Sequence, residues 1–256
     1  MLGLFAEQHR GQESCGMAVS DGRVFRLRKK MGLVKQVFTP EKLAEMPGKI
    51  AVGHVRYPTC GSATEYNSQP HIVETLSGPS YALASNGDII NYREIRIKLE
   101  AEGVYFASDN DGELILKYII WQVEKKDKSI IDAIKLLMHN VKGAFSTVLA
   151  TRNELYMFRD PHAIRPMVWG KTIKGTIVAA SESCALDIVG VKDYKEIGSA
   201  QIIVANDDGV RIIDNEPNQY RENNRDKHCI FEHIYFSRPD SVDFGENVYS
   251  VRKKIG

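Results

Sequence analysis

Residues 144–158 read AFSTVLATRNELYMF and decide the expected fold. Two β-type runs, Ala144 to Ala150 and Leu155 to Phe158, flank the short polar segment Thr151-Arg152-Asn153-Glu154. A connection this short joins antiparallel strands, because parallel strands need a crossover of a dozen or more residues. A second such connection, Asn206-Asp207-Asp208-Gly209, lies between two further β-type runs. The C-terminal half is therefore predicted to form antiparallel sheet.

Earlier in the chain, Lys49 to Tyr57 and Tyr81 to Ala84 are also predicted strands. The second is expected to end in a tight turn at Ser85-Asn86-Gly87-Asp88, and the first at Pro58-Thr59-Cys60-Gly61. A polar stretch from Asn215 to His228 is typical of a surface loop or linker.

Helical patterns concentrate between residues 91 and 143. Asn91 with Glu94 resembles a capping box, and the apolar repeat after it ends at Gly103. A second helix is expected to begin near Asp111, and a third at Ser129, with Asp132 in the capping-box position. A short helix opens at Thr39-Pro40. Helices in the middle with strands on both sides predict an α+β layered domain rather than alternating βαβ units.

The composition is that of an ordinary globular protein. The 256 residues are 43% hydrophobic and 26% charged, and 34 Lys+Arg against 33 Asp+Glu give a formal charge of +1. No global field therefore favours nucleic acid or an anionic membrane as a partner. No apolar run approaches the roughly 18 residues of a membrane span, so we expect a cytoplasmic protein. The four cysteines lie far apart, which predicts neither a metal ribbon nor a disulfide framework.

Three polar positions suggest binding chemistry. Arg56 ends a strand, where a guanidinium can grip a carboxylate with two hydrogen bonds or form a plain surface ion pair. Asn86 and Gly87 offer an amide and a backbone N–H that suit an oxyanion hole, although Asn-Gly also makes ordinary turns. Asp111 at a helix start can bind an ammonium group or simply cap the helix.

The motifs taken in order resemble a known family, the class II glutamine amidotransferases. The segments are Gln8-His9-Arg10-Gly11-Gln12-Glu13-Ser14, Gly53-His54-Val55-Arg56-Tyr57, Asn67-Ser68-Gln69-Pro70 and Asn86-Gly87. Three later stretches are similar to the amidophosphoribosyltransferase branch of purine synthesis. They are Phe158 to Pro166, Ala180 to Asp187 and Cys229 to Ser241.

The resemblance implies an N-terminal-nucleophile hydrolase fold, a four-layer αββα sandwich with two antiparallel sheets. Residues 1–228 would be the glutaminase domain, and residues 229–256 the start of a phosphoribosyltransferase domain. Glutamine would be hydrolysed to glutamate and ammonia, and the ammonia would convert phosphoribosylpyrophosphate into 5-phosphoribosylamine. The whole protein is expected to be a homo-oligomer.

The same resemblance assigns residue roles by motif match. Arg56 would hold the α-carboxylate of L-glutamine and Asp111 its α-ammonium group. Asn86 and Gly87 would stabilise the oxyanion, Arg10 would order the pocket near the nucleophile, and Thr59 would line it. A zwitterion needs one fixed cation and one fixed anion, which this set provides.

The family nucleophile is a cysteine at the mature amino terminus, whose α-amine is the general base. Its strand would lie upstream of the first motif, so we expect the chain as written to be inactive in both half-reactions. Cys15 and Cys60 do not replace it, because neither carries a free α-amine. The resemblance implies that the glutaminase domain needs no cofactor or metal. By the same resemblance Mg²⁺ is expected only in the full-length protein. Some members of the family hold a [4Fe–4S] cluster there, and Cys229 would match one of its ligands.

Two alternatives stay open at this point. The chain could be a non-catalytic module that binds glutamine without turnover. It could also be another class II amidotransferase, such as a glucosamine-6-phosphate synthase or an asparagine synthetase. The stretch from Cys229 to Ser241 argues against these two enzymes.

Overall fold

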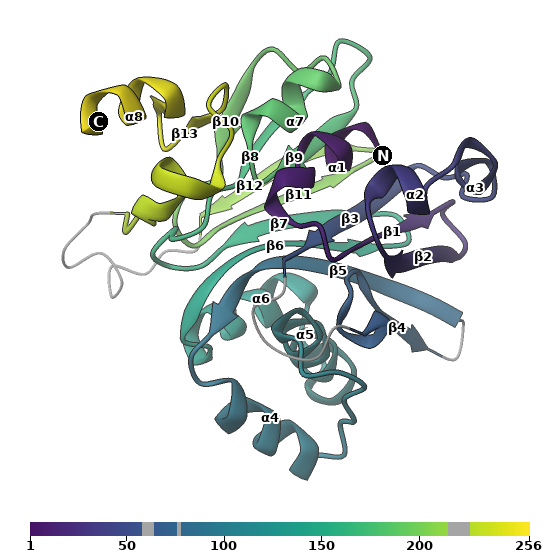
Figure 1. Ribbon diagram of the computed structural model, residues 1–256. Helices are drawn as coiled ribbons and strands as arrows, with labels where there is room; N and C mark the ends of the chain where they lie inside the picture. Colours follow the sequence, from purple (N-terminus) through teal and green to yellow (C-terminus); the bar gives the residue numbers. More distant parts are fainter. Residues whose placement is uncertain (58–63, 76–77, 215–225) are drawn as a thin grey trace.

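The computed structural model describes residues 1–57, 64–75, 78–214 and 226–256. A six-stranded antiparallel sheet in the order β12-β11-β7-β6-β5-β4 forms its centre (Figure 1). β6 (Gly143–Thr151) and β7 (Leu155–Arg159) form the hairpin predicted from residues 144–158. The second predicted hairpin is also confirmed. The other strands are β4 (His71–Thr75), β5 (Gly78–Ile89), β11 (Gln201–Asn206) and β12 (Gly209–Asp214).

Three helices cover one face of this sheet: α4 (Tyr92–Ala101), α5 (Asp111–Lys126) and α6 (Ile130–Asn140). They bury the largest hydrophobic cluster, in which Phe145 and Phe158 of the sheet meet edge to face with centroids 6.3 Å apart. Fully burying one such apolar side chain stabilises the fold by about 1.5–3 kcal/mol. The middle of the chain is therefore helical, as its periodicity predicts.

Two details of helix capping differ from expectation. Asn91 does not cap α4 with its side chain; its amide donates to Asn140 O at 3.0 Å and its oxygen accepts from Lys142 N at 2.8 Å, so it ties the helix to the β6 side. Asn110, not Asp111, caps α5 by accepting from Gly112 N at 2.9 Å. The Ser129 cap of α6 is confirmed, with Asp132 N donating to its hydroxyl at 3.1 Å.

The second β layer consists of two separate three-stranded sheets. One has the order β2-β1-β3 and the other β10-β8-β9. The first is built from β1 (Ser14–Ser20), β2 (Phe25–Met31) and β3 (Ile50–Arg56). The second is built from β8 (Val168–Lys171), β9 (Ile177–Ala180) and β10 (Tyr194–Glu196). β3 and β9 are therefore edge strands in the part of the chain described.

The outer helices complete the sandwich. They are α1 (Leu2–Ala6), α2 (Val34–Val37), α3 (Pro40–Ala44) and α7 (Ser183–Ile188). Two 3₁₀ turns lie elsewhere in the chain: η1 (Gln8–Arg10) follows α1, and η2 (Glu65–Asn67) precedes β4. Figure 1 shows α1 and α7 on the side of the second β layer away from α5 and α6. The predicted four-layer αββα fold is confirmed.

The C-terminal segment packs on the α7 end of the sandwich. It contains the π-helical turn η3 (Glu232–Phe236), the strands β13 (Val242–Asp243) and β14 (Glu246–Asn247), and α8 (Val248–Ile255). Val242 N donates to Ser183 Oγ at 2.9 Å. Residues 215–225 of the predicted linker lie outside the described residues. None of the helices described is long and apolar enough to cross a membrane.

Candidate functional site

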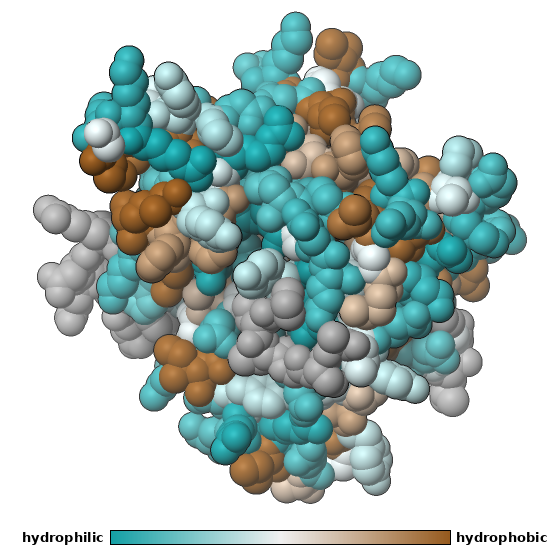
Figure 2. Space-filling view, viewed as in Figure 1, coloured by the Kyte–Doolittle hydropathy of each residue, from teal (hydrophilic) through white to brown (hydrophobic). Residues whose placement is uncertain are grey.

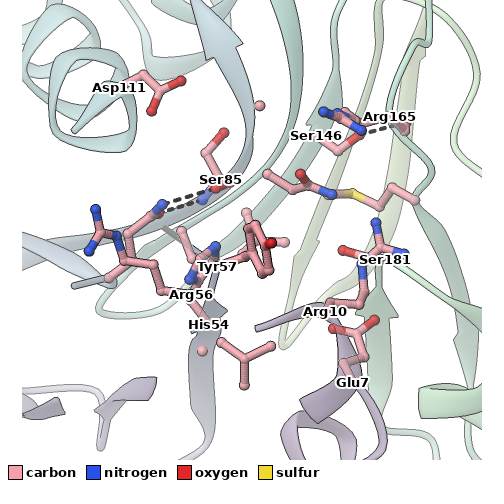
Figure 3. A pocket seen from close by; sticks show the side chains of 18 of the residues that line it. Glu7, Arg10, His54, Arg56, Tyr57, Ser85, Asp111, Ser146, Arg165 and Ser181 are labelled. Atoms are coloured by element: carbon pink, nitrogen blue, oxygen red, sulfur yellow. Dashed lines mark hydrogen bonds between the residues drawn. The ribbon is translucent and has the colours of Figure 1, made fainter. Parts of the chain in front are cut away.

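A cavity of about 230 Å³ opens at one end of the β layers (Figure 3). We call it the Arg56 cavity. It is lined by residues far apart in the sequence, and five of the six predicted site residues are among them: Arg10, Arg56, Asn86, Gly87 and Asp111. Thr59 lies outside the described residues. The fold thus brings to one place side chains that the sequence alone only suggests.

Arg56 is fixed at the end of β3. Its side chain is 4% exposed, and its Nη1 is ion-paired with Glu13 Oε2. The backbones of the two residues are also joined, with Glu13 N donating to Arg56 O at 3.1 Å. Gly11 is required nearby, because a Cβ there would lie 2.4 Å from the Arg56 carbonyl carbon. The first motif therefore packs against the second and holds the guanidinium at the cavity.

Asp111 occupies the first turn of α5, across the view of Figure 3 from Glu7 and Arg10. Burial raises the pKa of Asp111 to about 6; the nearby Asp88 also raises it, whereas Arg56 lowers it. The helix N-terminus favours the ionised carboxylate. Arg56 and Asp111 thus place one fixed cation and one carboxylate on the same small cavity.

Asn86 and Gly87 lie within β5 and not in the predicted tight turn. β5 continues to Ile89 because it pairs with β6 through this region, with Gly87 opposite Phe145. A Cβ on Gly87 would lie 2.2 Å from Ala144 O. Glycine is needed for the close approach of two strands, which explains why turn statistics mislead at this site.

The hydrogen-bond pattern directs the Gly87 N–H toward the cavity side. Phe145 uses its own N–H and C=O on Asp160, at 3.1 and 2.8 Å. Opposite residues in an antiparallel ladder exchange both bonds or neither, so Gly87 points away from β6. On that side β4 pairs with β5 only as far as Leu83. The Gly87 N–H is therefore placed to serve an oxyanion in the cavity.

Gln69 caps the same strand edge and was given no role by sequence reasoning. Its amide donates to Ser85 O at 3.0 Å and its oxygen accepts from Ser85 N at 2.8 Å. It thus takes the place of a neighbouring strand beside Ser85 and leaves the next outward-facing N–H, that of Gly87, to the cavity. The motif Asn67-Ser68-Gln69-Pro70 was the only signal for it.

Gly87→Ala is expected to lower the free energy of unfolding by about 1–3 kcal/mol, because the added Cβ meets strand backbone that cannot move aside. Chemical denaturation checks this. Gly3→Ala is the matched control, since its Cβ would have nothing nearer than 3.9 Å in the helix α1. Equal stability of the two variants would show that β5 and β6 do not approach as described.

Arg10 lines the cavity, but its guanidinium is bound to two carboxylates. Nη1 donates to Glu182 at 2.6 Å and Nη2 to Glu232 at 2.8 Å. Burial alone would lower the pKa of Arg10, but Glu232 and Glu182 raise it above its usual value. Arg10 therefore joins η1 to α7 and the C-terminal segment, and remains charged.

Glu182 is the centre of this network and was missed from the sequence. It is fully buried and also accepts from His9 Nε2 at 2.7 Å, Arg238 N at 2.9 Å and Ser241 Oγ at 2.8 Å. Burial raises the pKa of Glu182, but His9 and Arg10 outweigh that effect and bring it to about 2. The carboxylate thus stays ionised and ties three segments behind the cavity.

Glu7 and His54 are two further titratable groups of the cavity. Burial raises the pKa of Glu7 to about 7, although Arg10 lowers it, and its Oε1 accepts from Glu182 N at 2.9 Å. Burial and the charge of Arg56 lower the pKa of His54 to about 4, so the imidazole is neutral at pH 7. Within the described residues, its buried Nδ1 has no hydrogen-bond partner.

Comparison with known proteins shows which family the chain belongs to. Residues 55–187, just over half of the chain, match the model of the glutamine amidotransferase domain. The chain belongs to this family. The match includes Arg56, Asn86, Gly87 and Asp111, the residues that surround the Arg56 cavity, and so the resemblance read from the motifs is confirmed.

Relatives of this glutamine amidotransferase domain are similar over its whole length. An amidophosphoribosyltransferase of Methanothermobacter thermautotrophicus is 41% identical over 99% of the chain and 52% of its own length. An amidophosphoribosyltransferase of Synechococcus elongatus is 42% identical over 100% of the chain and 51% of its own length. A solved structure of the glutamine phosphoribosylpyrophosphate amidotransferase of B. subtilis, complexed with ADP and GMP, matches with a TM-score of 0.88 and 33% sequence identity. The match covers 99% of the chain and 53% of the B. subtilis chain. The chain spans about half the length of these relatives.

None of the cysteines in the described part of this glutamine amidotransferase domain lines the Arg56 cavity. Burial raises the pKa of Cys15 to about 11 and that of Cys184 to about 12. Cys229 lies 3.8 Å from Arg165 Nη1, and no group of three or more potential metal ligands occurs among the residues described. The single thiol of Cys229 cannot hold an iron–sulfur cluster by itself, because such clusters take several cysteine ligands. Cys60 lies outside the described residues.

Proposed function

We propose that this domain binds L-glutamine in the Arg56 cavity and is the glutaminase half of an amidophosphoribosyltransferase. The ammonia it releases would convert phosphoribosylpyrophosphate into 5-phosphoribosylamine in purine synthesis. The observation that carries the proposal is the placement of Arg56 and Asp111 on one cavity with Asn86 and Gly87. Similarity to amidophosphoribosyltransferases over 99–100% of the chain supports the branch.

Each group has a defined part in this proposal. Arg56 binds the α-carboxylate of glutamine and Asp111 its α-ammonium, which fixes the amino acid at one end. The side-chain carbonyl then lies where the Asn86 amide and the Gly87 N–H stabilise the tetrahedral oxyanion. Arg10 orders the pocket through Glu182 and Glu232 rather than by touching glutamine.

The proposal also covers the whole protein. Residues 229–256 begin a phosphoribosyltransferase domain, to which phosphoribosylpyrophosphate and Mg²⁺ belong, and the protein acts in the cytoplasm as a homo-oligomer. The nucleophile is a cysteine with a free α-amine. Its thiol attacks the side-chain amide carbon of glutamine, the thiol proton passes through the α-amine to the departing nitrogen, and ammonia leaves a thioester that water then hydrolyses to glutamate.

Residues 1–256 alone are expected to bind glutamine without hydrolysing it, because no described cysteine lies in the cavity. A coupled assay for glutamate release, run beside calorimetric titration of glutamine, tests this. Binding with no turnover agrees with the proposal. Turnover that disappears in Cys15→Ser or Cys60→Ser would contradict it, and absence of binding would remove its basis.

A non-catalytic glutamine-binding module is the second candidate function. It is favoured by the same arrangement, a pocket complete in Arg56, Asp111, Asn86 and Gly87 without a thiol among the described lining residues. A longer natural polypeptide that releases glutamate from glutamine would exclude it.

Glutamine affinity is expected to fall as the pH is lowered through about 6. The pKa of Asp111 is raised to about 6 by burial, and only its ionised form attracts the α-ammonium group. Below that pH the affinity should drop by up to about tenfold per pH unit. Titration calorimetry between pH 5 and 8 measures it.

Asp111→Asn should bind weakly and show no pH dependence near 6. Asp109→Asn, a change at an exposed neighbour with a side chain 73% exposed, should keep the wild-type profile. A pH dependence retained in Asp111→Asn would assign the titration to another group, such as Glu7.

A further inference from the structure

His71, the first residue of β4, is a buried histidine that does not line the Arg56 cavity. Its Nε2 lies 3.1 Å from Oδ1 of Asn110, a side chain that is also buried. Asn110 comes immediately before Asp111 in the sequence and caps α5. A buried histidine of the sheet is thus in contact with the segment that carries Asp111.

The imidazole of His71 is the donor in this contact. Burial, together with the charge of Lys29, lowers the pKa of His71 to about 3, so the ring is neutral at pH 7 and carries one N–H. Asn110 presents its oxygen here, because Oδ1 also accepts from Gly112 N at 2.9 Å. The ring hydrogen is therefore on Nε2, and the oxygen of Asn110 receives two hydrogen bonds at once.

These two hydrogen bonds hold the chain on both sides of Asp111. Asn110 and Gly112 are buried, whereas Asp111 between them is only half-buried and lines the cavity. The backbone of Gly112 is also closely packed, since a Cβ there would lie 2.7 Å from Gln69 Oε1. The place of the Asp111 carboxylate is therefore decided by its two neighbours, and His71 holds one of them.

The segment that carries His71 also reaches the strand of the proposed oxyanion site. Gln69, two residues before His71, is hydrogen-bonded to the N–H and C=O of Ser85 on β5. Gly87 follows two residues later on the same strand. One short segment thus contacts both the start of α5 and the strand of Gly87, so it helps to set the spacing between the two ends of a bound glutamine.

We propose that His71 is a positioning residue for glutamine: through Asn110 it holds the Asp111 carboxylate at the place where the α-ammonium group binds. The inference rests on the proposed function, because it names a further residue of the same site. His71 itself touches neither glutamine nor a reacting atom. A misplacement of about 1 Å is enough to weaken a fitted contact strongly, so loss of the His71 bond should impair recognition of the α-ammonium group and leave the rest of the site intact.

The affinity ratio of two ligands isolates this role. Glutaramate is glutamine without its α-amino group, so the Kd of glutaramate divided by that of L-glutamine measures what the α-ammonium group contributes. NMR chemical-shift titration of residues 1–256 gives both constants, including weak ones. In His71→Phe, which fills a similar space without an N–H donor, this ratio should fall by about tenfold. The Kd of glutaramate should stay within about twofold of the wild-type value, because Arg56 is untouched.

Three further variants separate positioning from a merely structural role. His71→Gln can place an N–H where Nε2 lies and should restore the wild-type ratio. Asn110→Ser keeps a favourable cap for α5 but is too short to reach His71, so it should lower the ratio as His71→Phe does. His139→Phe, at an exposed histidine of α6, should leave the ratio unchanged. Melting curves show whether each variant is folded, and if His71→Phe is not, Asn110→Ser decides.

A double variant tests whether His71 acts through Asp111. In Asp111→Asn the ratio should already be low, so the addition of His71→Phe should not lower it further. An unchanged ratio in folded His71→Phe or Asn110→Ser, or a further tenfold fall in the double variant, would overturn the inference while glutamine binding itself stands. Absence of glutamine binding by the wild type would instead remove the proposed function, and this inference with it.

Discussion

Arg56→Lys is expected to weaken glutamine binding by about a hundredfold. Lysine keeps the charge and can still pair with Glu13, but it lacks the planar fork that binds a carboxylate with two parallel hydrogen bonds. Lysine can keep one of the two hydrogen bonds, and the loss of the other costs about 1.5–3 kcal/mol, of which roughly 2.7 kcal/mol corresponds to two factors of ten. Titration calorimetry measures the change directly.

Arg93→Lys is the matched control for this variant. Arg93 is exposed on α4 and does not line the Arg56 cavity, so its substitution should leave glutamine affinity unchanged. Equal affinity of Arg56→Lys and the wild type would show that Arg56 does not hold the glutamine carboxylate.

Glu182→Ala is expected to lower the free energy of unfolding by about 3–5 kcal/mol, because it leaves Arg10 buried with one carboxylate fewer and frees the bonds to Arg238 and Ser241. In a domain of this size that is a fall in Tm of roughly 10 °C. Scanning calorimetry checks the value. Glu100→Ala breaks only an exposed pair with Arg96 and should cost less than about 1 kcal/mol.

The stabilisation by Glu182 should depend on pH in a defined direction. Its pKa is lowered from the usual 4.5 to about 2 in the folded protein. A lowered pKa stabilises the fold above pH 4.5, and that contribution is lost as the pH falls from 4.5 to 2. The Tm difference between wild type and Glu182→Ala should therefore shrink on acidification. A constant difference would exclude an ionised Glu182.

Sequence patterns predicted most of the helices and hairpins, because turns, caps and apolar periodicity depend on residues that are close together in the sequence. The hairpin at residues 144–158 and the Ser129 cap depend on neighbours in sequence. The prediction of a turn at Asn86-Gly87 was wrong, because Gly87 lies inside a strand where the backbone of Ala144 on the next strand leaves no room for a Cβ. The fold was expected to contain two antiparallel sheets, but the second β layer consists of two separate three-stranded sheets. Which strands pair is decided by tertiary contacts, which local patterns do not show.

The candidate site could be predicted only in part for the same reason. Arg56, Asn86, Gly87 and Asp111 were recognised through motifs, and all line one cavity. Glu182 and Gln69 lie in two of the quoted motifs, but no local pattern assigned them a role. Glu182 meets Arg10 across 172 positions of sequence, and Gln69 acts by occupying a strand edge.

The central claim is that the Arg56 cavity binds glutamine as a zwitterion between Arg56 and Asp111. Its most direct test is calorimetric titration of residues 1–256 with L-glutamine, its methyl ester and its N-acetyl derivative at pH 7.5. The ester removes the charge that Arg56 binds, and the acetyl group removes the charge that Asp111 binds. We expect L-glutamine alone to bind measurably. Binding of either derivative as tight as that of L-glutamine would contradict the claim.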